Sequence, residues 1–209
     1  MFTDNVNTLA TGQDFPRAIG FTPSGSLVYF LTTKQLWSMP TGGGAVSILA
    51  GHSWSGFKDA NGTVALFRDP SGLVVHPVTG VAYITDSGNH RIRTCTPDGQ
   101  VSTLAGNGTI GNIDGAAFLA TFNYPWGIVM DPTNQYLYVV CYNANTLRQV
   151  SVNTGRTTTI AGSGAPLSID GTGLVASFIK PMYVCIGDDH GVGFFRSLLH
   201  CIHKSFCMS

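Results

Sequence analysis

Residues 70–106 read PSGLVVHPVTGVAYITDSGNHRIRTCTPDGQVSTLAG, and this stretch decides the fold. It holds four short runs of apolar or alternating residues, each bounded by Gly, Asn, Asp or Pro, which is typical of β-strands rather than helices. The runs cover residues 72–76, 81–85, 91–95 and 101–104. Turn sequences lie between them, so the stretch predicts a four-stranded meander.

Three landmarks recur along the chain, and all three keep nearly the same spacing from one occurrence to the next. The first is an Ala-Gly pair, which ends at Gly51, Gly106 and Gly162. The second is a proline that closely follows a phenylalanine, and we call these the landmark prolines: Pro16, Pro70, Pro125 and Pro181. The third is an aspartate, which recurs as Asp59, Asp114 and Asp170. Landmarks that share one period indicate a repeated structural unit.

A repeated unit of four strands predicts a blade of a β-propeller, because one such sheet cannot bury its faces without neighbours. We therefore predict an all-β fold, an incomplete β-propeller of about three and a half four-stranded blades. The blades are expected within residues 1–191, at about 5–51, 52–106, 107–162 and, in part, 163–191. Residues 192–209 remain as a divergent tail.

The apolar residues of this tail fall at near-helical spacing and predict a short amphipathic helix. They are Phe194, Phe195, Leu198, Leu199, Ile202 and Phe206. Such a helix would cover the last blade or touch a membrane surface, and a disordered tail is the alternative. It is too short to cross a bilayer.

The tail also holds residues of the metal-ligand type, namely His200, Cys201, His203 and Cys207. Their spacing matches no standard zinc finger or knuckle, so we interpret them as incidental and predict no metal site. The five cysteines of the chain form an odd-numbered set without Cys-x-x-Cys spacing. They therefore specify no disulfide framework.

Composition argues against several function classes. Charged residues make up 11% of the 209-residue chain, and 11 basic residues balance 11 acidic ones. A neutral chain lacks the long-range field that attracts nucleic acid, so we expect no nucleic-acid partner. No apolar window reaches the length of a membrane span, and the first residues show no secretory signal. The compartment stays open, with the low charge and the abundant Thr and Asn leaning toward an extracellular setting.

Three stretches of the sequence resemble the NHL repeat, at residues 83–93, 101–106 and 114–128. The resemblance extends over roughly residues 5–190. It implies a closed ring, commonly of six blades. Because this chain supplies about three and a half, we expect a fragment whose missing blades complete the ring, a truncated or degenerate gene product, or a homo-oligomer that closes it. An open ring would otherwise expose apolar blade faces and a strand edge.

The polar loop at residues 86–91 is the candidate binding site. Exposed loops on a rigid scaffold are where ligands usually bind, which singles out Asp86, Asn89, His90 and Arg91. A structural interpretation is favoured, because Asp and Asn shape tight turns and Gly88 would supply a positive φ. The corresponding loops of the neighbouring units have different sequences.

The sequence contains no catalytic motif. His90 has no carboxylate or nucleophile paired with it at a fixed spacing, so we predict no catalytic residue and no cofactor. The recurring aspartates are interpreted as scaffold elements. Aromatic residues near other loops lack basic companions in the sequence and are interpreted as blade packing. They are Trp54, Phe57, Trp126 and Tyr142.

We therefore expect a non-catalytic scaffold that presents propeller loops to a protein or glycan ligand. One alternative, implied by the propeller resemblance, is a fragment of a metal-dependent lyase or hydrolase. Its metal ligands would come from inner strands, where this chain is apolar, as at Leu73 and Ile128. A second alternative is an RNA-binding NHL domain, against which the neutral charge counts.

Overall fold

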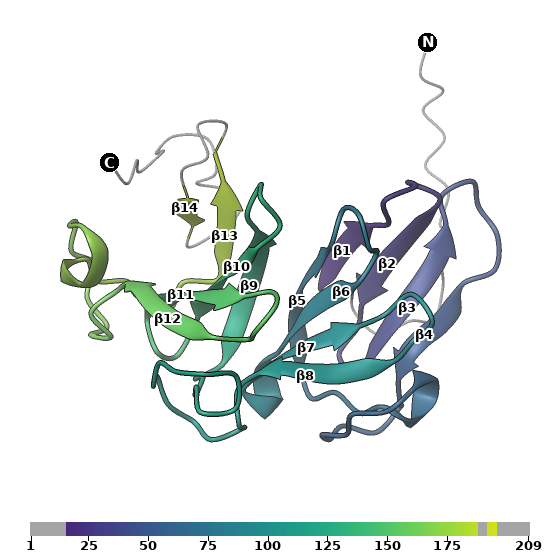
Figure 1. Ribbon diagram of the computed structural model, residues 1–209, viewed down its shortest axis with the longest axis horizontal. Helices are drawn as coiled ribbons and strands as arrows, with labels where there is room; N and C mark the ends of the chain where they lie inside the picture. The colour runs from purple at the N-terminus through teal and green to yellow at the C-terminus, as the bar shows by residue number, and fades with distance from the viewer. Residues whose placement is uncertain (1–15, 188–191, 196–209) are drawn as a thin grey trace, which may run out of the picture.

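The computed structural model describes residues 16–187 and 192–195, which form four antiparallel sheets in chain order (Figure 1). The first sheet holds β1 (Ala18–Phe21), β2 (Leu27–Leu31), β3 (Gln35–Pro40) and β4 (Ser47–Gly51). The second holds β5 (Pro70–Val75), β6 (Ala82–Asp86), β7 (Arg91–Cys95) and β8 (Val101–Ala105). The third holds β9 (Pro125–Met130), β10 (Tyr136–Cys141), β11 (Thr146–Ser151) and β12 (Thr157–Ala161). The fourth pairs β13 (Tyr183–Ile186) with β14 (Val192–Phe195).

The predicted fold class is confirmed. Each of the first three sheets is a meander in which every strand pairs with the next along the chain. We call the four sheets blades 1 to 4. The helical content of the described residues is three single-turn 3₁₀ helices, η1 (Gly62–Val64), η2 (Ser87–Asn89) and η3 (Gly173–Val175). None of these helices is long or apolar enough to cross a membrane.

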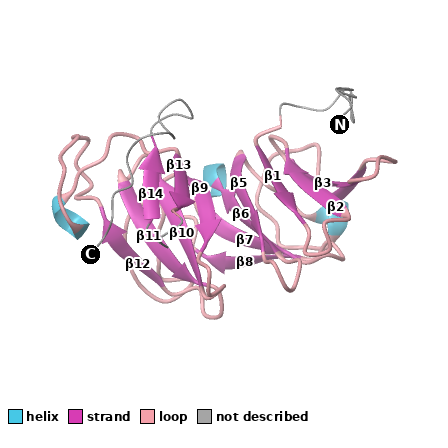
Figure 2. Cartoon of the chain, turned by 90° about the horizontal axis from the view of Figure 1, so that it is seen from above, coloured by secondary structure: helices cyan, strands magenta, loops and turns pink. Residues whose placement is uncertain are grey.

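The first strands of successive blades lie side by side, so that β5 contacts both β1 and β9, and β9 also contacts β13. Figure 2 shows blade 1 on one side of the molecule and blades 3 and 4 together on the other. One position shows how regular the repeat is. Three residues after each landmark proline stand Ile19, Leu73, Ile128 and Val184. The first three pair with equivalent residues of the second strand, Phe30, Ile84 and Val139.

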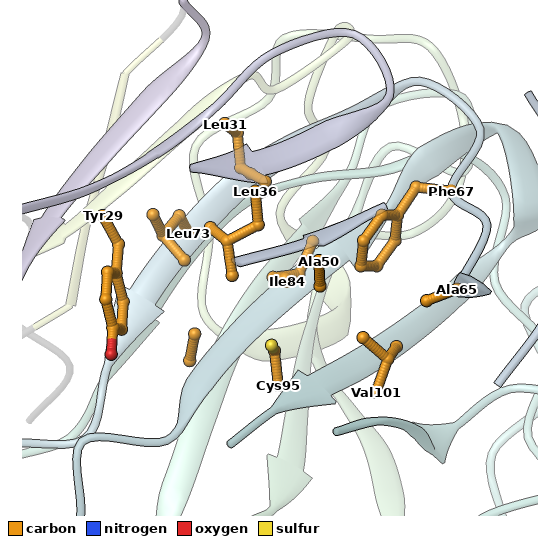
Figure 3. Packing of buried hydrophobic residues seen from close by; sticks show 11 residues of the cluster. Tyr29, Leu31, Leu36, Ala50, Ala65, Phe67, Leu73, Ile84, Cys95 and Val101 are labelled. Atoms are coloured by element: carbon orange, nitrogen blue, oxygen red, sulfur yellow. The ribbon is translucent and has the colours of Figure 1, made fainter. Parts of the chain in front are cut away.

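Apolar side chains fill the space between blades. Figure 3 shows Leu31 and Leu36 of blade 1 packed with Leu73 and Ile84 of blade 2, beside Phe67 of the connecting segment. Blades 2 and 3 enclose an equivalent cluster around Phe122. Burial of each such side chain contributes about 1.5–3 kcal/mol, so these clusters are what holds one blade against the next.

Two glycines allow the inner strands to approach closely. A Cβ atom on Gly72 would lie 2.3 Å from the Trp126 carbonyl oxygen of the next blade. A Cβ atom on Gly127, the equivalent residue, would lie 2.5 Å from the Met182 carbonyl oxygen. Any larger residue at these positions would push the blades apart.

The tail differs from the expected helix at its start. Val192–Phe195 form strand β14, and Val184 of β13 pairs with Phe194. The edge of β13 offers unpaired backbone groups, and valine and phenylalanine favour the extended conformation. These residues therefore pair as a strand, although the spacing of their apolar residues resembles that of a helix. Blade 4 therefore includes residues that we assigned to the tail. Residues 196–209, with His200, Cys201, His203 and Cys207, lie outside the described residues.

Candidate binding surface

The loop after β6 is organised by a buried carboxylate. Asp86 is fully buried, and its oxygens accept hydrogen bonds from Arg93 Nη1 (2.6 Å), the Arg68 backbone N–H (2.8 Å) and Asn89 Nδ2 (2.8 Å). Asn89 also donates to the Gly56 carbonyl at 2.7 Å. Burial raises the pKa of Asp86, and the Arg93 charge and these hydrogen bonds oppose that effect. The polar atoms of Asp86 and Asn89 are thus engaged within the protein, which favours the structural interpretation for both.

Arg93 is the centre of this network. Its guanidinium is fully buried and also donates to Asp59 Oδ1 at 2.6 Å and to the carbonyls of Lys58 and Leu66. A buried charge is tolerated only when it is paired and hydrogen-bonded, as here. This cluster, which we call the arginine clamp, therefore fastens the segment before blade 2 to the third strand of that blade.

Blade 3 repeats the arginine clamp, but an asparagine takes the place of the second aspartate as a hydrogen-bond acceptor. Arg148 is fully buried and donates to Asp114 Oδ1 at 2.8 Å and to Asn112 Oδ1 at 2.9 Å. Asp114 also accepts hydrogen bonds from Thr159, as Asp59 does from Thr103 in blade 2. This geometry agrees with a scaffold role for the recurring aspartates.

Cys141 of blade 3 stands where blade 2 has Asp86. Burial raises the pKa of the Cys141 thiol to about 11 and that of Cys95 to about 12, so neither thiol is reactive near neutral pH. Among the described residues, no group of three His, Cys, Asp or Glu side chains could hold a metal ion.

The positive φ of the loop belongs to His90, at 54°, and not to Gly88 as we expected. Gly88 is required for another reason, because a Cβ atom there would lie 2.8 Å from the Arg68 carbonyl oxygen. His90 Nδ1 accepts a hydrogen bond from the Tyr124 backbone N–H at 3.2 Å. Asn145 has a φ of 55°, and its Oδ1 atom likewise accepts a hydrogen bond from the Lys180 backbone N–H at 2.9 Å. His90 and Asn145 therefore have the same role. His90 links blade 2 to blade 3, and Asn145 links blade 3 to blade 4.

We expect His90→Asn to leave stability at neutral pH within about 0.5 kcal/mol of the wild type, because asparagine tolerates this backbone conformation. Burial, and then the charges of Arg68 and Arg91, lower the pKa of His90 below 6.5. The unfolded chain therefore binds a proton more readily, and this contribution to stability is present above pH 6.5 and is lost as the pH falls through the folded-state pKa. Urea titrations from pH 7 to pH 4 should show a shallower loss of stability in His90→Asn. An identical slope in both proteins would contradict this role for His90.

Arg91 contacts the outer side of the loop. Its guanidinium donates to the carbonyls of Asn89 (3.0 Å) and Asn107 (2.6 Å) and lies 3.8 Å from the centre of the Phe57 ring. All four candidate residues thus make contacts within the scaffold. His90 also lies half-buried beside the aromatic ring of Tyr124.

The residue before each of three landmark prolines has an unusual backbone conformation. Asp69, Tyr124 and Lys180 have φ values of 55°, 58° and 48°. Residues with a Cβ atom rarely adopt positive φ, and a following proline normally favours extended backbone. The conformation is repeated in each of these blades while the side chain changes from Asp to Tyr to Lys. What varies at this end of the inner strands is therefore the chemistry of the exposed groups.

These side chains form a continuous cluster across the blades. Arg17 forms an ion pair with Asp69 at 2.9 Å, and the Tyr124 hydroxyl donates to the other Asp69 oxygen at 3.1 Å. The Tyr124 ring lies 5.7 Å from that of Trp126, and Trp126 lies 5.5 Å from Tyr142. Lys180 Nζ lies 5.4 Å from the centre of the Tyr142 ring. We call this set the rim cluster: Arg17, Asp69, Tyr124, Trp126, Tyr142 and Lys180.

Sequence reasoning missed the rim cluster. We interpreted Trp126 and Tyr142 as blade packing because no basic residue stands near them in the sequence. The fold supplies basic companions from distant positions, Lys180 over Tyr142 and Arg17 through Asp69. A signal was present, since most of these residues directly precede or follow a landmark proline.

Comparisons with known proteins agree with this architecture. Residues 67–95 match the family model of the NHL repeat. The NHL repeat-containing protein 2 of Bos taurus is 32% identical over 101 residues, which cover 47% of this chain and 14% of that protein. The chain therefore contains an NHL repeat.

A second relative is the chloroplastic protein SUPPRESSOR OF QUENCHING 1 of Arabidopsis thaliana. It is 30% identical over 139 residues, which cover 64% of this chain and 13% of that protein. The chain thus spans about one seventh of the length of these curated relatives.

Solved structures share the fold. A Bacteroides thetaiotaomicron protein of unknown function is 25% identical with a TM-score of 0.70, and the match covers 86% of this chain and 44% of that one. An auxiliary nutrient binding protein from Bacteroides ovatus is 18% identical with a TM-score of 0.63, covering 81% and 42%. Virginiamycin B lyase from Staphylococcus aureus is 15% identical with a TM-score of 0.58, covering 89% and 50%. At such identities the last two indicate the fold alone.

Proposed function

We propose that this chain is a non-catalytic binding scaffold and that it binds a protein ligand through the rim cluster. The observation that carries the proposal is the meeting of side chains from all four blades at one end of the inner strands. Arg17, Asp69, Trp126 and Lys180 lie in, or just before, the inner strands of blades 1, 2, 3 and 4 in turn. Loops held by a rigid scaffold are the usual place for recognition.

The chemistry of the cluster suits a protein surface. Tyrosine, tryptophan and arginine are the residues most enriched at the energetic centres of protein interfaces. Tyr124, Trp126 and Tyr142 are half-buried, so each ring is held by the scaffold while part of it remains open to a ligand. Rings held in this way lose little conformational entropy on binding.

The charged residues of the cluster would orient a bound ligand. Arg17 and Asp69 form their ion pair while 28% and 43% of their side chains remain exposed. An exposed pair contributes little to stability, so both groups are available to rearrange toward a ligand. Lys180 is exposed at the opposite end. A peptide lying across the aromatic rings would therefore meet the Arg17–Asp69 ion pair at one end and a basic group at the other.

We expect Tyr142→Ala to weaken binding of a protein ligand by about 30-fold, the loss typical of a residue at the energetic centre of an interface. The probe is a display library of random peptides selected on the wild-type chain, with affinities of the enriched peptides measured by calorimetry. Trp54→Ala is the matched control, because Trp54 is an aromatic residue that is 74% exposed outside the cluster.

Equal affinity of the selected peptides for Tyr142→Ala and the wild type would contradict the proposal, provided that both proteins melt at the same temperature. Binding only to a glycan array, with no peptide enriched, would instead indicate a glycan ligand and overturn the protein assignment.

A further inference from the structure

The rim cluster offers a ligand hydrogen-bond donors but few free acceptors. The indole N–H of Trp126 and the hydroxyl of Tyr142 bond to no other described residue, and neither side chain is fully buried. Lys180 is exposed and forms no ion pair within the described chain. Both oxygens of the Asp69 carboxylate already accept hydrogen bonds from within the cluster. A ligand that fits this surface therefore supplies acceptors and needs few in return.

The backbone of the surrounding loops is already engaged. The N–H groups of Tyr124 and Lys180 donate to His90 Nδ1 and Asn145 Oδ1 of the preceding blades. The Tyr124 carbonyl accepts a hydrogen bond from the Tyr142 backbone N–H at 3.0 Å. The positive φ of Tyr124 and Lys180 also interrupts the extended conformation ahead of each inner strand. A ligand that adds as a β-strand would find no regular row of free backbone groups here.

Among the recurring ways in which proteins bind peptides, one matches such a donor-rich aromatic surface. A helical ligand bonds its own carbonyls internally, and a strand needs partners for both its N–H and its C=O groups. A polyproline II segment has no internal hydrogen bonds, so its carbonyls stay free, and proline has no N–H group to satisfy. Segments of this kind dock on surfaces lined by aromatic rings.

We propose that the ligand segment bound by the rim cluster is proline-rich and adopts the polyproline II conformation. This inference rests on the proposed function and names its ligand class. The centres of the Tyr124, Trp126 and Tyr142 rings lie 5.5–6.3 Å from one another, with their planes tilted by 34–58°. One turn of polyproline II rises about 9 Å, so a single turn spans two adjacent rings. The proline rings pack against the tilted aromatic faces, and Trp126 and Tyr142 donate to the ligand carbonyls.

The same library of random peptides, selected on the wild-type chain, tests this inference. The enriched peptides should share prolines, and the free peptides should have the circular dichroism spectrum of polyproline II. Replacing those prolines with alanine in a synthetic copy should weaken binding by about 10-fold or more, because the peptide loses its preorganised conformation. This comparison changes only the peptide, so it does not depend on the folding of any variant.

Trp126→Phe tests the hydrogen-bond donor. Phenylalanine keeps an aromatic ring but lacks the N–H group, so the affinity for the enriched peptides should fall by about 5-fold, the contribution of one hydrogen bond. Trp54→Phe is the matched control, because Trp54 is 74% exposed outside the rim cluster and its replacement should leave the affinity unchanged. A thermal melt of each variant shows whether it is folded like the wild type.

The possible outcomes distinguish this inference from the proposed function. Enriched peptides that lack proline, or that bind equally well after proline is replaced by alanine, would overturn the ligand class and leave the binding scaffold in place. Equal affinities of folded Trp126→Phe and the wild type would also overturn it. If no peptide is enriched, or if the enriched peptides bind Tyr142→Ala as tightly as the wild type, the proposed function itself is wrong.

Discussion

Replacing Arg93 with methionine is expected to lower the free energy of unfolding by about 3–5 kcal/mol, because it leaves the buried Asp86 carboxylate without its charged partner. Arg93 and Asp86 are both fully buried, and their closest atoms are 2.6 Å apart. Methionine fills much of the same space but cannot donate the hydrogen bonds that Asp86 and Asp59 receive. Urea denaturation at neutral pH measures the loss.

Arg156→Met is the matched control for that experiment. Arg156 is exposed at the end of a turn, and its replacement should change stability by less than about 0.5 kcal/mol. Similar losses in the two variants would show that Arg93 contributes only general surface charge. A stable Arg93→Met protein would contradict the clamp described above.

Replacing Phe122 with alanine is expected to cost about 3–5 kcal/mol, the range for a large aromatic side chain lost from a packed core. Phe122 is fully buried in the cluster between blades 2 and 3, and its ring lies 5.1 Å from the Arg148 guanidinium. Phe118 precedes it in the same connecting segment and is 63% exposed. Phe118→Ala should therefore leave stability nearly unchanged. Equal effects of the two substitutions would contradict the assignment of Phe122 to the blade interface.

The strands and their grouping into blades could be predicted because the signals are local and repeated. Turn residues bound each strand in residues 70–106, and the landmark prolines return with one period. The conformation of the loop after β6 was harder to predict. Glycine is the default residue for a positive φ, yet here His90 has it while Gly88 is needed for its small size.

The burial of Arg93 and Arg148 was not predicted, because a charged residue is rarely buried unless it finds partners. Those partners lie far earlier in the chain, at Asp59 and Asp114. The one hint of the contact in the sequence is that the two Asp–Arg pairs stand one repeat period apart. The rim cluster could not be predicted from the sequence for a similar reason. Its members come from four blades and meet only when the inner strands stand side by side.

Amide hydrogen exchange followed by mass spectrometry tests the central claim that successive repeats fold as equivalent stacked blades. The middle strands of blades 2 and 3 are paired on both sides, so peptides covering β6 and β7 should exchange slowly and to the same extent as those covering β10 and β11. The connecting segment at residues 107–119 should exchange much faster. Rapid exchange in β10 and β11, or protection that runs through the connecting segment without a break, would contradict the account.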